Sequence, residues 1–159
     1  MAIEFVIEDG TNKTDATSYV TVADFRQYWE NRGVDYATYA DSQCQVALNK
    51  ATQYIDNLYL YQGQKETVTQ SLEFPRDCLY DRNYIDQSST IPDRLQYAVC
   101  ECAGFAIEGN SFDPANANVR SKSMGKLSVT YDKVNAKNPK LIKAEKYIGD
   151  YAQGTRVSI

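Results

Sequence analysis

Apolar residues recur with helical spacing along the middle of the chain. The clearest run opens at Asp41 and continues to about Tyr59, with one apolar face over about four turns. Apolar residues that repeat at positions i, i+3, i+4 and i+7 favour an amphipathic helix. The pattern therefore predicts a long helix with one buried face. The apolar residues of this face are Cys44, Ala47, Leu48, Ala51, Tyr54, Ile55 and Leu58.

Three further helices are predicted from the same spacing and from the residues that bound them. Their predicted ranges are 22–31, 92–109 and 138–151. Thr21 is suited to cap the first of these helices, because its hydroxyl can accept a hydrogen bond from a free backbone N–H. Asn138 and Pro139 favour the start of the last helix for the same reason and because proline suits the first helical position.

The spacing changes from helical to alternating between residues 119 and 132. Val119, Ser121 and Ser123 alternate with charged residues. Leu127, Val129 and Tyr131 alternate with polar residues. A Gly-Lys pair separates the two runs and suits a two-residue turn, so we predict a β-hairpin over residues 119–132. A short strand is also predicted over residues 2–8.

These elements predict a mainly α fold: a small bundle of three to four helices with a β-hairpin and a short N-terminal strand. We expect one domain over residues 1–151 and a mobile tail over residues 152–159. The parts of the domain are an N-terminal strand or arm (1–17), a helical core (18–110), the hairpin (119–132) and a C-terminal helix (138–151). The connection over residues 62–90 is long, and such loops are often functional.

The composition argues against an enzyme. The chain has no histidine, which removes the Ser-His-Asp and Cys-His arrangements and every zinc site with a histidine ligand. The sequence also lacks the glycine-rich phosphate-binding patterns, so we expect no catalytic residues, cofactor or metal. The acidic loop residues Asp77, Asp81 and Asp86 are expected to be solvated. The four cysteines are expected to be reduced, small core residues, and they are Cys44, Cys78, Cys100 and Cys102.

Charge is unevenly distributed along the chain. Residues 1–118 hold 8 of the 17 Lys and Arg residues and 18 of the 21 Asp and Glu residues, a balance of −10. Residues 119–159 hold the other 9 basic and 3 acidic residues, a balance of +6. Such polarity indicates an interaction surface, although a lysine-rich face also serves solubility alone. No stretch approaches the ~20 apolar residues of a membrane span, and no signal peptide is seen at the start.

Five segments, in this order, resemble a family of tailed-bacteriophage proteins described as DnaT-like single-stranded-DNA-binding proteins. The segments are residues 18–24 (SYVTVAD), 51–56 (ATQYID), 72–76 (LEFPR) with 80–82 (YDR), 91–95 (IPDRL) and 122–131 (KSMGKLSVTY). Members of this family look like the helical head–tail connector proteins, also called adaptor or head-completion proteins. The resemblance covers residues 2–151, and Phe74 stands where many relatives are expected to carry tryptophan.

The resemblance implies a structural virion protein that forms a dodecameric ring beneath the portal and extends the DNA channel. The implied partners are the portal protein, neighbouring copies of the chain, a tail or stopper protein, and genomic DNA that passes without sequence-specific binding. The implied location is the neck of the virion, with the host cytoplasm before assembly. No cofactor and no membrane contact are implied.

Basic and aromatic residues are the candidates for these contacts. We expect the C-terminal segment to dock on the portal, because it carries the positive charge of the chain. The candidates for this docking are Lys137, Lys140, Lys143, Lys146 and Tyr151. The candidates for subunit or tail contacts are Arg76, Tyr80, Arg82, Lys122 and Lys126.

Two alternatives remain open from the sequence. Binding of single-stranded DNA needs a basic groove with aromatic rings on which bases stack. The hairpin offers Arg120, Lys122, Lys126 and Tyr131 for this purpose, although the sequence pI of about 4.9 is low for a nucleic-acid-binding domain. A tail-completion or tail-terminator protein is the other alternative, and its usual sheet-dominated fold disagrees with the predicted helices.

Overall fold

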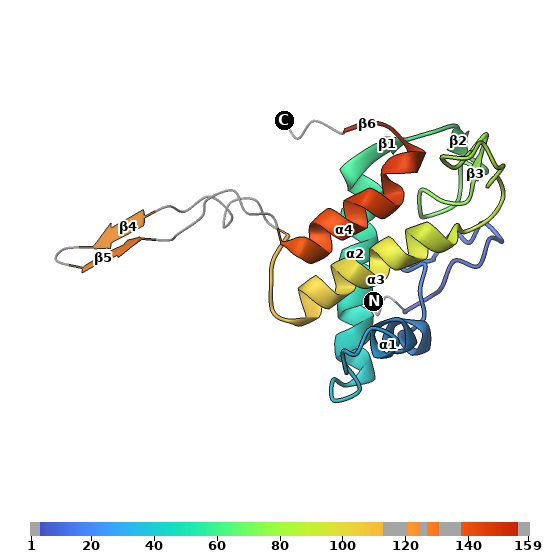
Figure 1. Cartoon of the computed structure of the whole chain (residues 1–159). Coiled ribbons are helices and arrows are strands. Elements are labelled where there is room, and N and C mark those ends of the chain that lie inside the picture. Colours follow the sequence, from blue (N-terminus) through green and yellow to red (C-terminus); the bar gives the residue numbers. More distant parts are fainter. Residues whose placement is uncertain (1–3, 113–120, 125–126, 131–137, 156–159) are drawn as a thin grey trace.

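The computed structural model in Figure 1 describes residues 4–112, 121–124, 127–130 and 138–155. Four α-helices lie in this part of the chain, so the predicted mainly α fold is confirmed. They are α1 (Val22–Glu30), α2 (Asp41–Leu58), α3 (Asp93–Ile107) and α4 (Pro139–Ile148). A short 3-10 helix, Gly149–Tyr151, continues α4.

The predicted caps explain where two of the helices begin. The Thr21 side chain accepts a hydrogen bond from the backbone N–H of Asp24, and Asn138 does the same for Lys140. Each cap satisfies a donor that has no partner within its helix. Helix α3 begins one residue later than predicted, because Pro92 is its cap and Asp93 its first residue.

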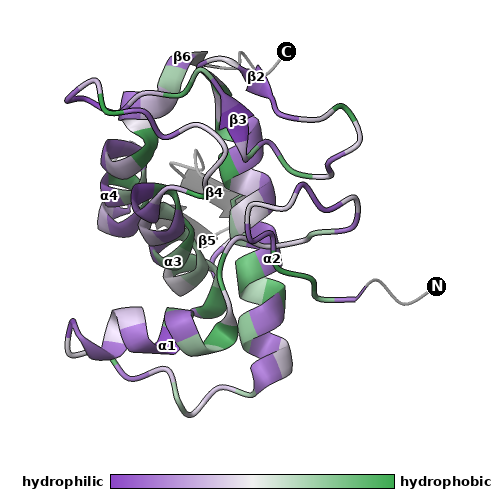
Figure 2. Cartoon of the chain, turned by 90° about the vertical axis from the view of Figure 1, so that its right-hand side faces the viewer, coloured by the Kyte–Doolittle hydropathy of each residue, from purple (hydrophilic) through white to green (hydrophobic). Residues whose placement is uncertain are grey.

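Helix α3 is the centre of the fold, since it packs against α1, α2 and α4. Its approach to α1 depends on Gly104, where an added Cβ would lie 2.5 Å from the ring of Trp29. The indole Nε1 of Trp29 donates to the carbonyl of Cys100 at 3.1 Å. Figure 2 shows that the hydrophobic faces of the helices turn toward one another. The largest fully buried apolar side chains there include Phe25, Leu48, Ile55, Leu95 and Ile148.

Short strands, paired two by two, complete the described fold. β1 (Tyr59–Tyr61) pairs antiparallel with β6 (Ala152–Thr155), and β2 (Gln64–Lys65) pairs antiparallel with β3 (Arg76–Asp77). β4 (Ser121–Met124) and β5 (Leu127–Thr130) form the predicted hairpin, with Met124 opposite Leu127. The turn between them lies outside the described residues.

Several predictions about the ends and loops of the chain are wrong. Residues 4–8 form no strand, and Ile7 makes only a single parallel bridge to Ser18. Residues 152–155 are not a mobile tail, because they pair with β1. The long connection over residues 62–90 contains the short strands β2 and β3. Cys44, Cys100 and Cys102 are free and buried as expected, whereas Cys78 is exposed.

Candidate nucleic-acid interface

Three tyrosines from three helices form a continuous row on one face of the bundle. Tyr28 comes from α1, Tyr97 from α3 and Tyr147 from α4. The ring centroids of Tyr28 and Tyr97 are 5.6 Å apart, and those of Tyr97 and Tyr147 are also 5.6 Å apart. Tyr28 is buried and Tyr147 is half-buried, while Tyr97 keeps 39% of its surface exposed. The row therefore presents an accessible aromatic ring at its centre.

An arginine stands at each end of these tyrosines. The guanidinium carbon of Arg32 lies 3.5 Å from the ring centroid of Tyr28, and that of Arg94 lies 5.5 Å from the ring centroid of Tyr147. Backbone carbonyls hold both side chains in place, because Arg32 donates to the Tyr28 carbonyl at 2.9 Å and Arg94 to that of Tyr147 at 3.1 Å. We call the five residues Arg32, Tyr28, Tyr97, Tyr147 and Arg94 the arginine–tyrosine row.

A groove follows the α1–α3 part of this row. Its volume is about 270 Å³, and Tyr28, Arg32 and Tyr97 line it together with other residues along α1 and the first half of α3. A groove that joins aromatic faces to guanidinium groups suits a ligand with flat rings and negative charge. Arg32 makes no ion pair with any carboxylate of the described residues, so its charge is available to such a ligand.

A buried carboxylate positions the α1 end of the row, where Tyr28 lies. Glu101 is 1% exposed, and its Oε1 accepts a hydrogen bond from the Tyr28 hydroxyl and forms a salt bridge with Lys143 Nζ at 2.9 Å. Burial and the bond to Glu101 raise the pKa of Tyr28 well above its usual value. Tyr28 therefore stays a neutral hydrogen-bond donor and its ring keeps one orientation beside Tyr97.

The lysines of α4 flank the same face. Lys140 Nζ donates to the Tyr36 hydroxyl at 3.0 Å and to Glu108, and it lies 5.1 Å from the ring centroid of Trp29. Although burial opposes ionisation of Glu108, the hydrogen bonds from Lys140 and Tyr36 lower the pKa of this carboxyl. Lys146 is exposed, and its backbone carbonyl accepts from Arg94 at 3.2 Å.

Two of the residues predicted to make external contacts are instead buried, so these predictions are wrong. Tyr151 is 1% exposed and packs at 6.4 Å, between ring centroids, from Phe74. Arg76 is 7% exposed and donates to the carbonyls of Gln62 and Gly63 and to the carboxylate of Glu73. Both side chains stabilise the domain, because Tyr151 packs on Phe74 and the donors of Arg76 bond to groups of the chain itself.

The other predicted contact residues are scattered. Tyr80 is 43% exposed, and Arg82 pairs with Asp150 at 2.9 Å. Lys122 lies in β4, while Lys126 and Lys137 lie outside the described residues. The structure therefore brings Lys140, Lys143 and Lys146 to the α1–α3–α4 face and leaves Tyr80 in a separate loop.

Sequence reasoning missed all five residues of the arginine–tyrosine row. A signal for them was present, because Tyr28 and Arg32 are four residues apart and Arg94 and Tyr97 are three apart. Side chains at these spacings are neighbours on a helix surface. The uneven charge along the chain indicated the lysines near the C-terminus instead.

The described part of the chain contains neither a cluster of potential metal ligands nor a helix suited to span a membrane. No group of three or more potential metal ligands occurs there. Asp81 accepts hydrogen bonds from the backbone N–H groups of Asn83 and Ile85, so its carboxylate holds its own loop. Among the helices that the structure describes, none has the length and apolar character needed to cross a membrane.

Fold and surface together define a small helical protein with an arginine–tyrosine face suited to aromatic, anionic ligands. Comparison with family models agrees with this class. Residues 3–159 match the family described as "Putative DnaT-like ssDNA binding protein", and the chain belongs to this family. The match includes residues 152–159, which the sequence resemblance did not cover. No curated protein and no solved structure matched the chain significantly.

The family match corrects the main functional prediction. The expected head–tail connector role is wrong, since the family is described by binding of single-stranded DNA and nothing in the match indicates a connector. The same finding overturns the predicted portal, tail and ring partners and the predicted passage of genomic DNA without sequence-specific binding. The alternative drawn from the sequence, binding of single-stranded DNA, agrees better with the family.

Proposed function

We propose that this protein binds single-stranded DNA and that the arginine–tyrosine row is its contact surface. The observation that carries the proposal is the exposed ring of Tyr97, which lies between two other tyrosines, with an arginine over the ring at each end of the row. The description of the family supports the same activity. The proposed role is binding without catalysis, which is also supported by the absence of histidine from the sequence.

Stacking is the main source of affinity in this proposal. A base of single-stranded DNA is free to stack on an exposed aromatic ring, and each such contact contributes about 1–3 kcal/mol. Tyr97 is the ring with the most accessible face in the row. Because every base has a π face, this contact tolerates any sequence. Duplex DNA keeps its bases paired and stacked, so it gains little from the same ring.

Electrostatic attraction is expected to be modest and local. The whole chain carries a net charge of −4, and several cations of this face already pair with carboxylates. Lys140 pairs with Glu108, Lys143 with Glu101 at 2.9 Å, and Arg94 with Asp150 at 3.5 Å. Few cations therefore remain for phosphates. With about two to three phosphates neutralised, log K should fall with log salt with a slope of about −1.4 to −2.1.

Fluorescence anisotropy tests the proposal directly. A labelled thymine-only strand of about 16 nucleotides is titrated with protein at about 50 and 200 mM salt. We expect binding that is tighter than to a duplex of the same length and that weakens with the shallow slope given above. Failure of the folded protein to bind the single strand at low salt would overturn the proposed function.

Two tyrosine variants locate the contact surface. Tyr97→Ala should weaken binding by about tenfold, because one stacking contact is lost. Tyr84→Ala is the matched control, since Tyr84 is 88% exposed but lies in the loop after β3, outside the row. An equal loss of affinity in both variants would contradict the assignment of the row, while leaving DNA binding itself in place.

A further inference from the structure

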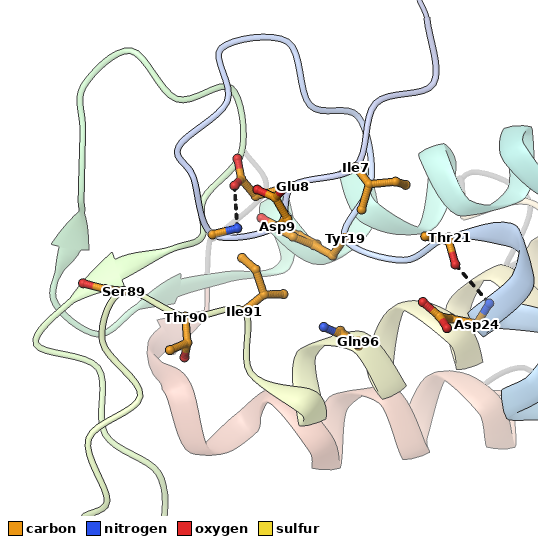
Figure 3. Close-up of a pocket in the computed structure, with 11 residues that line it drawn as sticks. Ile7, Glu8, Asp9, Tyr19, Thr21, Asp24, Ser89, Thr90, Ile91 and Gln96 are labelled. Carbon is orange, nitrogen blue, oxygen red and sulfur yellow. Dashed lines mark hydrogen bonds between the residues drawn. The ribbon is translucent and has the colours of Figure 1, made fainter.

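A second pocket adjoins the groove beside the arginine–tyrosine row. It lies between the N-terminal segment, the start of α1 and the start of α3, and its volume is about 390 Å³ (Figure 3). Asp24 and Gln96 line both the pocket and the groove. The two hollows are therefore adjacent, and a strand that lies in the groove can reach the pocket with one of its groups.

Some of the polar groups around this pocket already have partners in the N-terminal loop. The carboxylate of Glu8 accepts hydrogen bonds from the backbone N–H groups of Gly10, Asn12 and Lys13. Asp9 pairs with Lys13 at 3.1 Å. These two carboxylates hold the loop in shape, so they are not the groups that would bind a ligand.

Asp24 and Gln96 differ from them. Within the described residues, neither the Asp24 carboxylate nor the Gln96 side-chain amide has a hydrogen-bond or ion-pair partner. Figure 3 shows the Asp24 carboxylate extending from α1 in the direction of Gln96 on α3. The Asp24 carboxylate offers only acceptors, whereas the Gln96 amide offers two donors and an acceptor. Both residues line the pocket and the groove.

The other walls of the pocket suit a flat ring. Ile7 and Ile91, both half-buried, contribute apolar surface, and Tyr19 lies behind them. A small-ligand site typically combines such apolar walls with a few polar groups that fix orientation. The carboxylates disfavour a phosphate inside the pocket, whereas Arg32 in the adjoining groove favours one there. A nucleotide would therefore place its base in the pocket and its phosphate in the groove.

The acceptor character of Asp24 selects among the bases. An ionised carboxylate only accepts hydrogen bonds. Guanine offers it two adjacent donors, N1–H and the 2-amino group, and the neighbouring O6 can accept from the Gln96 amide. Thymine offers a single N–H between two carbonyl oxygens, which a carboxylate repels. Adenine and cytosine offer an amino group beside a ring nitrogen that is an acceptor.

We infer that the pocket between Asp24 and Gln96 receives one base of a bound single strand and prefers guanine. The inference rests on the proposed function, since the strand must first be bound in the groove. Asp24 accepts from N1–H and the 2-amino group, Gln96 donates to O6, and Ile7 and Ile91 cover the faces of the ring.

The preference is measured with three strands of equal length, about 16 nucleotides each. The first contains thymine only, the second alternates thymine with guanine, and the third alternates thymine with inosine, which lacks the 2-amino group. Lithium buffer keeps the guanine-containing strand from associating with itself. We expect the guanine strand to bind about tenfold more tightly than the thymine strand, as one bidentate base contact allows. Inosine should lose most of this gain.

Two variants assign the preference to the pocket. Asp24→Asn should bring the ratio of guanine-strand to thymine-strand affinity close to one, because the amide no longer offers two acceptors. Asp9→Asn removes a carboxylate from the same pocket and should keep the ratio, which controls for a general effect of charge. Melting temperatures of both variants check that α1 and the N-terminal loop remain folded.

The possible results separate this inference from the proposed function. Equal affinity of the unaltered protein for all three strands would overturn the guanine pocket and leave single-stranded-DNA binding intact. Persistence of the preference in folded Asp24→Asn would also overturn the pocket. Absence of binding to every strand would instead overturn the proposed function itself.

Discussion

Among the described residues, arginines lie over aromatic rings in two clusters, the arginine–tyrosine row and the surroundings of Arg76, with opposite consequences. Arg76 lies 6.0 Å from the ring centroid of Phe74 and is 7% exposed. Its guanidinium donates to the Gln62 carbonyl at 2.8 Å, the Gly63 carbonyl at 3.1 Å and the Glu73 carboxylate at 2.8 Å. Arg32 lies closer to its ring, at 3.5 Å, and yet it is exposed.

The two clusters differ in how far the chain itself supplies hydrogen-bond acceptors for the guanidinium and covers the aromatic rings. Around Arg76, backbone carbonyls accept from the guanidinium, and β1 and the 3-10 helix after α4 bring Tyr61 and Tyr151 against Phe74. Around Arg32, the open groove leaves the Tyr97 ring and guanidinium donors accessible. The first cluster therefore stabilises the fold, while the second has surface left for a ligand. Residue type alone does not separate these two outcomes.

Removal of the buried guanidinium of Arg76 should lower the free energy of unfolding more than any other change predicted for this protein. Arg76→Ala removes the buried donor to the Gln62 and Gly63 carbonyls and the nearer of two cations that pair with Glu73, so the free energy of unfolding should fall by about 3–5 kcal/mol. Chemical denaturation measures this change. Arg32→Ala is the matched control, and its free energy of unfolding should change by less than about 1 kcal/mol. A similar loss of unfolding free energy in both variants would contradict the difference drawn between the two clusters.

The buried cluster should also make stability depend on pH. Asp56 joins this cluster by accepting from the Tyr19 hydroxyl at 2.8 Å and the Glu73 backbone N–H at 3.2 Å. Burial raises the pKa of Asp56 from 3.8 to about 7, against the opposing effect of the hydrogen bond from Tyr19. The folded state then binds a proton that the unfolded state has released, so stability falls as pH rises from about 4 to 7.

Thermal or chemical unfolding across this pH range checks the sign of the effect. The expected fall is about 2–4 kcal/mol, and stability should level off above the folded-state pKa. Asp56→Asn should flatten the curve between pH values of about 5 and 8, whatever its absolute stability. A stability that rises through this window in the unaltered protein would contradict the raised pKa.

The smallest expected effect is a gain in DNA affinity at the exposed arginine–tyrosine row. Asp150 pairs with Arg82 at 2.9 Å and with Arg94 at 3.5 Å, and so it competes with a phosphate for both guanidinium groups. Asp150→Asn should therefore raise the affinity for a thymine-only strand by about two- to fivefold, in line with the energy of an exposed ion pair. Anisotropy titration measures the gain.

Asp41→Asn provides the comparison for this gain in affinity. It releases Arg26 from an ion pair of 2.8 Å, but Arg26 is not part of the arginine–tyrosine row. The same net change of charge should then leave DNA affinity almost unaltered. A gain of equal size in both variants would mean that overall charge, and not the row, governs binding.

Local patterns were sufficient for most of the regular structure. The helical spacing over residues 41–59 predicted α2, which ends at Leu58, one residue before the predicted end. Thr21 and Asn138 predicted the starts of α1 and α4 because a cap acts on backbone groups only a few residues away. The hairpin of β4 and β5 followed from alternation and a two-residue turn, which are also local.

Contacts between distant segments decided what the sequence left open. Whether residues 152–155 are free or paired depends on β1, which lies far away in the chain. Whether Arg76 or Arg32 is exposed depends on which segments cover it, since each lies within three residues of an aromatic in the sequence. The sequence by itself determined helix positions and the absence of histidine chemistry. Only the tertiary structure decided which arginines and tyrosines meet on a surface, because burial is a property of packing between segments.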